Sequence, residues 1–183
     1  MTELDGPPFE PGLVMEALER HQVRYIVVGG IAGNLHGAQR PTQDFDMVAL
    51  SGAENLARVA AALNELGARL RVGGLTDAES AELSPPVRAD TLDMEISTWM
   101  TDAGAVDVLR DIPSRRGEHS RYEDLLPGST EMTSDRLTVK VVGLDDLIRS
   151  KEWADRPKDH ESLGELRALR DAQGQGPDLL PPR

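Results

Sequence analysis

The chain has 183 residues, with 32 acidic and 20 basic side chains, no cysteine and a formal net charge of −12. This length fits one domain with its own hydrophobic core, and the lack of cysteine excludes a disulfide framework and a thiolate metal site. No apolar run approaches the roughly 20 residues of a membrane-spanning helix, and the N-terminus lacks the basic and apolar regions of a signal peptide. We therefore expect a cytoplasmic protein without a membrane partner.

The N-terminal region predicts an arm followed by a helix. Residues 1–10 contain two prolines after a glycine and no periodic pattern, which indicates a flexible arm. A helix is expected from Pro11 to near His21, because proline is favoured at the first helical position and apolar residues then recur at helical spacing.

The next segment predicts a phosphate-binding turn. Residues 24–29 are typical of a buried strand, and this strand ends at the pair Gly29-Gly30. Glycine permits a sharp turn there and leaves backbone N–H groups open to a phosphate. A short helix is expected over residues 31–37, and its N-terminus would favour an anion.

Two aspartates in the following strand indicate a metal site. The strand is expected over residues 44–50, and side chains in a strand repeat every two residues. Asp44 and Asp46 therefore share one face, while Phe45 and Met47 point to the other. Two carboxylates on one face favour the binding of a divalent cation.

The remaining elements complete an α/β pattern. A long helix is expected to open at Ser51 or Gly52 and to end at Gly67. Two strands are then expected over residues 92–99 and 105–109, a polar loop with one helical turn over 110–126, a hairpin over 130–133 and 136–142, and helices over 144–153 and 158–171. Residues 172–183 are rich in glycine and proline, which predicts a disordered tail.

These motifs resemble a known superfamily. The strand, Gly29-Gly30, a short helix and Asp-Phe-Asp, with thirteen residues between Gly30 and Asp44, are similar to the signature of polymerase-β-like nucleotidyltransferases. The form RPTQDFD, residues 40–46, is more similar to one branch, the AbiEii or Men-type toxins of bacterial toxin–antitoxin pairs and their uncharacterised relatives. The segment SKEWADRPKDHESL, residues 150–163, resembles the helix pair that follows the catalytic core in this branch.

The resemblance implies a fold and its organisation. We expect a polymerase-β-like nucleotidyltransferase core, a mixed twisted sheet flanked by helices, over residues 11–142. The C-terminal helical extension, residues 143–171, is expected to pack on this core.

The resemblance also implies the site residues. The expected catalytic residues are Asp44, Asp46, Asp107, Lys151 and Asp159, of which the first three would hold the metal, Mg²⁺ or Mn²⁺. Asp159 would orient Lys151. The expected nucleotide-binding residues are Gly29, Gly30, Arg40, Thr42 and Lys158. Asp107 is chosen because the superfamily has its third carboxylate on a later strand, and spacing alone leaves Asp93 and Glu95 open.

The resemblance implies transfer of a nucleoside monophosphate from an NTP to an acceptor hydroxyl, with release of pyrophosphate. Its toxin branch suggests the 3′ end of a tRNA as acceptor and a separately encoded antitoxin as partner. The net charge of −12 disfavours a nucleic acid, although two basic groupings are candidates for lining a substrate groove: Arg110, Arg115, Arg116 and Arg121, and Arg149, Lys151, Arg156 and Lys158. A protein or small-molecule acceptor, or a catalytically silent binding module, stays open.

Overall fold

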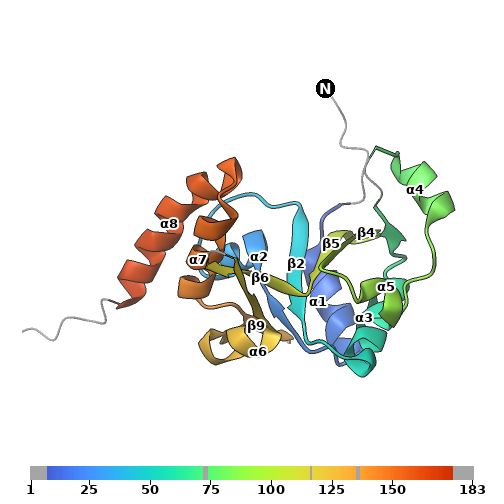
Figure 1. Ribbon diagram of the computed structural model, residues 1–183, viewed down its shortest axis with the longest axis horizontal. Helices are drawn as coiled ribbons and strands as arrows, with labels where there is room; N and C mark the ends of the chain where they lie inside the picture. Colours follow the sequence, from blue (N-terminus) through green and yellow to red (C-terminus); the bar gives the residue numbers. More distant parts are fainter. Residues whose placement is uncertain (1–7, 72–73, 116, 135–136, 175–183) are drawn as a thin grey trace, which may run out of the picture.

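The computed structural model describes residues 8–71, 74–115, 117–134 and 137–174. In these residues a seven-stranded sheet with the order β3-β4-β5-β2-β1-β9-β8 is flanked by helices, and β6 and β7 form a separate two-stranded ribbon (Figure 1). The elements are α1 (Pro11–Arg20), β1 (Tyr25–Val27), α2 (Gly29–Leu35), β2 (Asp44–Ala49), α3 (Ala53–Glu65), β3 (Arg69–Leu70), α4 (Asp77–Leu83), α5 (Ala89–Leu92), β4 (Ile96–Thr101), β5 (Gly104–Leu109), β6 (Asp111–Arg115), β7 (Glu118–Arg121), α6 (Tyr122–Leu125), a 3₁₀ turn (Leu126–Gly128), β8 (Thr130–Ser134), β9 (Leu137–Val141), α7 (Leu144–Ala154) and α8 (Pro157–Gly174).

The sheet is mixed, as the resemblance implied. Strand β2 runs antiparallel to β1 and parallel to β5, whereas β1 and β9 are parallel. The register of β2 and β5 places Asp46 directly opposite Asp107. Side chains that pair across two strands lie on the same face of a sheet, so this register determines which carboxylates meet.

The core lies on the other face of β2. Phe45 and Met47 are completely buried, and burial of such side chains stabilises the fold by about 1.5–3 kcal/mol each. Helix α3 covers this face with Val59 and Leu63, which are equally inaccessible. The alternation along β2 therefore anchors the strand in the core and leaves its aspartates on the opposite face.

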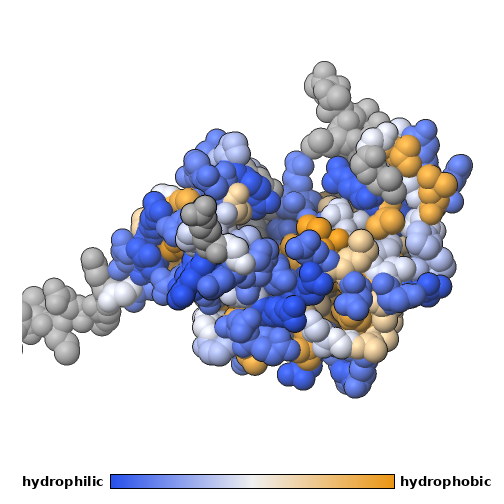
Figure 2. All heavy atoms as spheres, in the orientation of Figure 1, coloured by the Kyte–Doolittle hydropathy of each residue, from blue (hydrophilic) through white to orange (hydrophobic). Residues whose placement is uncertain are grey.

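The two C-terminal helices pack together beside α2 (Figure 1). Helix α7 buries Leu144, Leu147 and Ile148, the apolar stripe of the sequence. In α8 the buried Leu166 lies 3.6 Å from the position that a Cβ atom would occupy on Gly33 of α2. This packing brings the C-terminal end of α7 and the N-terminal end of α8 close to the start of β2. On the face shown in Figure 2, both helices carry mostly hydrophilic side chains.

Residues 110–126 were expected to form a polar loop with one helical turn. The loop is wrong, because the ribbon β6-β7 takes its place, whereas the helical turn is present as α6. Ile112 is buried and anchors the ribbon, and the imidazole Nδ1 of His119 lies 2.7 Å from a carboxylate oxygen of Asp111. The charged residues around Ile112 concealed the strand pattern in the sequence.

The two chain ends differ in part from expectation. Residues 1–7 of the predicted arm lie outside the described residues, but Phe9 packs against the core and over Gly104. The amide of Glu10 donates a hydrogen bond to the carbonyl of Ala103 at 2.9 Å, which fixes residues 8–10 in place. At the other end, residues 172–174 continue α8, and the remaining predicted tail, residues 175–183, is outside the described chain.

Within the part of the chain that the structure describes, no helix is long and apolar enough to cross a membrane.

Candidate active site

Three carboxylates meet on the open face of the sheet. Asp44 and Asp46 lie on β2, and Asp107 lies on β5 in register with Asp46. One oxygen of each carboxylate lies within 4.8 Å of the others, and all three residues are half-buried. The structure thus brings together the three residues expected to hold a metal. Asp93 follows α5 and Glu95 precedes β4, and neither belongs to this cluster.

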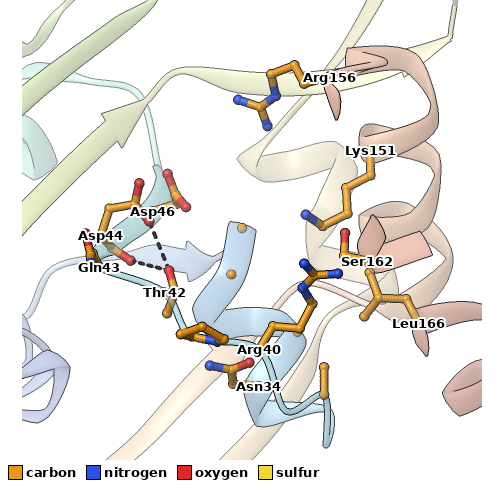
Figure 3. A pocket seen from close by; sticks show the side chains of 15 residues that line it. Asn34, Arg40, Thr42, Gln43, Asp44, Asp46, Lys151, Arg156, Ser162 and Leu166 are labelled. Atoms are coloured by element: carbon orange, nitrogen blue, oxygen red, sulfur yellow. Dashed lines mark hydrogen bonds between the residues drawn. The ribbon is translucent and has the colours of Figure 1, made fainter. Parts of the chain in front are cut away.

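Thr42 orients the first of these aspartates. Its hydroxyl oxygen lies 3.0 Å from Oδ1 of Asp44 and 3.3 Å from the Asp44 carbonyl oxygen, and the hydroxyl can donate to either (Figure 3). A Cβ atom on Gly30 would lie only 2.6 Å from this hydroxyl oxygen. Gly30 therefore lets α2 approach the segment that carries Thr42.

Gly29 has a different requirement. Helix α2 begins at this residue, two positions earlier than expected, so the glycine pair forms the first turn of the helix. Gly29 has a φ of +64°, which disfavours residues with a side chain. A Cβ atom there would lie 1.9 Å from Oδ2 of Asp46. The Asp46 carboxylate thus occupies the space that a side chain on residue 29 would need.

Gly29→Ala is expected to destabilise the protein by more than about 1 kcal/mol, because it adds a steric clash to the strained φ. Gly164→Ala is the matched control: Gly164 lies inside α8 with nothing within 4 Å of the position that a Cβ atom would occupy, and alanine there should stabilise by about 0.5–1 kcal/mol. Urea unfolding of both variants checks this. Equal stability of Gly29→Ala and the native protein would contradict the assigned role of Gly29.

A second cluster faces the aspartates from the C-terminal helices. Asp159 is completely buried at the start of α8. Lys151 Nζ lies 3.1 Å from its Oδ1, and Arg156 Nε lies 2.7 Å from its Oδ2. Burial alone would raise the pKa of Asp159, but the hydrogen bonds from Arg156 and Lys151 outweigh burial and hold this pKa below its ordinary value. The cluster therefore contains two cations and one carboxylate.

Asp159→Asn should lower the free energy of unfolding at pH 7 by about 1–3 kcal/mol, because it weakens two charge-assisted hydrogen bonds to a buried group. Since the pKa is lowered in the folded state, the carboxylate contributes stability above the unfolded pKa of about 3.9, and this contribution disappears as the pH falls through the folded pKa.

Urea unfolding from pH 7 to pH 2.5 would test this dependence. The difference between the native protein and Asp159→Asn should shrink at the acid end. Asp171→Asn, which changes an exposed aspartate of the same helix, should show almost no difference at any pH. A constant gap for Asp159→Asn over the whole range would disprove the assigned coupling.

A cavity of about 380 Å³ lies between the clusters and is lined by Asp44 and Asp46 of the first and by Lys151 and Arg156 of the second. Figure 3 shows Lys151 and Arg156 extending across it toward Asp44 and Asp46. Arg40 lines the same cavity, and its Nη2 lies 2.6 Å from a carboxylate oxygen of Glu161. The other residues that line it are Gly29, Gly30, Gly33, Asn34, Ala38, Pro41, Thr42, Gln43, Ser162 and Leu166.

Most of the expected nucleotide-binding residues therefore surround one cavity. The exception is Lys158, which lies in α8 but whose side chain is outside the described part of the structure. Of the second basic grouping, Lys151 and Arg156 line the cavity. Within the described residues the first grouping contributes no lining side chain, and Arg116 is not described. Sequence reasoning gave no role to Ser162 or Leu166, because only the packing of α8 on α2 brings them here.

No protein-family model matches the sequence, and no curated protein is significantly similar to it. Solved structures are similar in fold. The lincosamide antibiotic adenylyltransferase LnuA in its lincomycin-bound form has 14% sequence identity and a TM-score of 0.59, and the match covers 90% of this chain and 99% of that enzyme. ANT(2'')-Ia in complex with adenylyl-2''-tobramycin has 14% identity and a TM-score of 0.52 over 88% of this chain and 93% of that one. The chain thus has the polymerase-β-like nucleotidyltransferase fold, with an aspartate triad in its sheet.

Proposed function

We propose that the protein is a nucleotidyltransferase that moves a nucleoside monophosphate from an NTP to the hydroxyl group of an acceptor and releases pyrophosphate. The observation that carries this proposal is the arrangement of the cavity: Asp44 and Asp46 of the carboxylate triad on one wall, cationic side chains on the other, and glycine backbone between them. In a metal-bound triphosphate, the phosphate oxygens are negative and the metal ion is positive. The phosphates therefore match the cationic wall, and the metal ion matches the carboxylate wall.

The carboxylate triad suits a hard divalent cation. Mg²⁺ prefers oxygen ligands and is commonly bound by carboxylates together with substrate phosphates, and Mn²⁺ uses similar ligands. Asp44, Asp46 and Asp107 would hold the ion, which supplies charge stabilisation at the reacting phosphoryl group. Asp107 is also the candidate to accept the proton of the attacking hydroxyl.

The other residues bind and orient the nucleotide in this proposal. The backbone of Gly29 and Gly30 lies against the phosphates in this proposal, and a Cβ atom at either glycine would displace Asp46 or Thr42 from the same wall. Arg40, Lys151 and Lys158 neutralise phosphate charge, and Thr42 keeps Asp44 in position. Asp159 holds the ammonium group of Lys151 at the edge of the cavity.

A small hydroxylated molecule is the favoured acceptor. The net charge of −12 works against a polyanionic substrate. Arg69 and Arg110 lie beside the carboxylates of Asp102 and Asp111, which balance the charges of these two arginines and leave them less able to attract a nucleic acid. The fold neighbours include an enzyme bound to lincomycin and one in complex with adenylyl-2''-tobramycin. A tRNA acceptor, a toxin role and an antitoxin partner depend only on the resemblance of RPTQDFD and the C-terminal segment.

Labelled NTPs separate these possibilities. The purified protein is incubated with Mg²⁺, each NTP carrying ³²P at either the α or the γ position, and three acceptor sets: hydroxylated small molecules, total tRNA and protein. We expect the α label, and not the γ label, on a small molecule. Labelled tRNA would replace this acceptor with a nucleic acid. Transfer of γ label alone, or of no label to any acceptor, would overturn the proposed function.

A further inference from the structure

We propose that Arg156 binds the terminal part of the triphosphate and makes the site selective for nucleoside triphosphates over monophosphates. This inference rests on the proposed function, because it assigns a specificity-determining residue to the same cavity. Arg156 lies in the connection between α7 and α8 and lines the cavity together with Lys151.

The two cations that share Asp159 differ in exposure. The side chain of Lys151 is 14% exposed, whereas that of Arg156 is 58% exposed. Asp159 itself is fully buried and carries one negative charge, so it balances only one of its two partners. The cluster retains a positive charge toward the cavity, and the accessible part of this charge belongs to Arg156. A phosphate in the cavity therefore has readier access to this guanidinium than to the ammonium group of Lys151.

The hydrogen bonds of Arg156 leave part of its guanidinium available. Its Nε and Nη2 lie 2.7 Å and 3.4 Å from the two carboxylate oxygens of Asp159. Within the described residues its Nη1 has no hydrogen-bond or ion-pair partner, and a guanidinium has five N–H donors in a planar arrangement. Figure 3 shows this group directed across the cavity toward the side where Asp44 and Asp46 lie. Phosphate oxygens match the geometry of the remaining donors.

The backbone fixes this orientation. Asp155 ends α7 with a φ of +48°, in the left-handed region that aspartate tolerates better than most residues. The chain reverses direction at Asp155, and the side chain of Arg156 then reaches Asp159, which lies three residues further along the chain. A guanidinium held in advance by a buried carboxylate loses little conformational entropy when it binds a ligand. We therefore interpret Arg156 as an anion-binding group whose orientation is fixed before the ligand binds.

Binding without turnover tests this role. Calorimetry measures the affinity of each of the four NTPs and four NMPs, with Mg²⁺, for the native protein, Arg156→Gln, Arg156→Lys and the control Arg149→Gln. Arg149 lies on α7, bonds to Asp146 and does not line the cavity. For the NTP that binds best, Arg156→Gln should weaken affinity about 10- to 100-fold, the loss of a charge-assisted hydrogen bond to phosphate. The corresponding NMP should change less than about twofold, and Arg156→Lys should recover part of the loss.

Each outcome has a distinct meaning. Equal losses for NTP and NMP, together with a lower melting temperature, would overturn the proposal in favour of a structural role for Arg156. Unchanged NTP affinity in a folded Arg156→Gln protein would overturn it as well. If the native protein binds no NTP at all, the proposed function fails first. A native protein that binds NTP and an Arg156→Gln variant that binds it equally well would leave the nucleotidyltransferase proposal standing and remove only Arg156.

Discussion

Asp46→Ala is expected to reduce metal-dependent nucleotide transfer at least about a thousandfold, because it removes one ligand from the centre that stabilises charge in the transition state. Asp46 lies on the same strand as Asp44 and directly opposite Asp107, so its loss removes one of the three clustered carboxylates. Asp46→Asn keeps the volume and removes the charge, and it should have a similar effect. The measurement is the initial rate of α-label transfer at saturating Mg²⁺.

Stability provides the control for this experiment. Three carboxylates held within 4.8 Å repel one another without a cation, so Asp46→Asn should not lower the melting temperature in metal-free buffer. Asp102→Asn changes an exposed aspartate at the turn between β4 and β5 and should retain full activity. Near-native turnover by a folded Asp46→Ala protein would remove the triad from the mechanism.

Lys151→Ala should reduce transfer by about a hundredfold or more, the usual cost of removing one preorganised group that stabilises developing negative charge. Lys151 lies one helical turn beyond Leu147 and Ile148, and this apolar stripe fixes the helix face that carries its ammonium group to the cavity. Lys151→Arg should restore activity only in part, because a planar guanidinium differs in shape and hydration from an ammonium ion.

Rates and melting temperatures of the two Lys151 variants, measured together, distinguish this role from a structural one. A lysine that only covers the edge of the core would leave both variants active, and alanine would then cost a little stability. Arg167→Gln in α8, which breaks an exposed pair with Glu152, is the matched control and should leave the rate unchanged. Full activity in Lys151→Ala would exclude Lys151 from catalysis.

The strands that carry the triad were predictable, because their sequence patterns are strong and local. The alternation around Phe45 and Met47 gave the face of Asp44 and Asp46, and the valines around Asp107 gave the face of that residue. The pairing of β2 with β5 was not available from spacing, since about sixty residues separate the strands. The resemblance suggested Asp107, and the register now places it opposite Asp46.

The parts that the sequence did not predict depend on tertiary contacts. In the ribbon β6-β7 the buried anchor is Ile112 and most other residues are polar. The sequence therefore shows no alternation of apolar and polar residues that would indicate a strand. Phe9, at the end of the segment predicted to be a loose arm, packs over Gly104, a contact that no local pattern encodes. Arg156 was recognised only as part of a basic grouping, because its partner Asp159 becomes buried only when α8 packs on α2 and α7.

The most direct test of the proposed metal and nucleotide site is Mn²⁺ binding followed by electron paramagnetic resonance, because it needs no acceptor. The native protein is titrated with Mn²⁺ in the presence and absence of a non-hydrolysable NTP analogue, beside the variants Asp44→Asn, Asp46→Asn and Asp107→Asn. We predict that the native protein binds Mn²⁺ more tightly when the analogue is present, and that each substitution weakens this binding at least about tenfold. Native-like Mn²⁺ affinity in all three variants, with the analogue present, would contradict the assignment of this site.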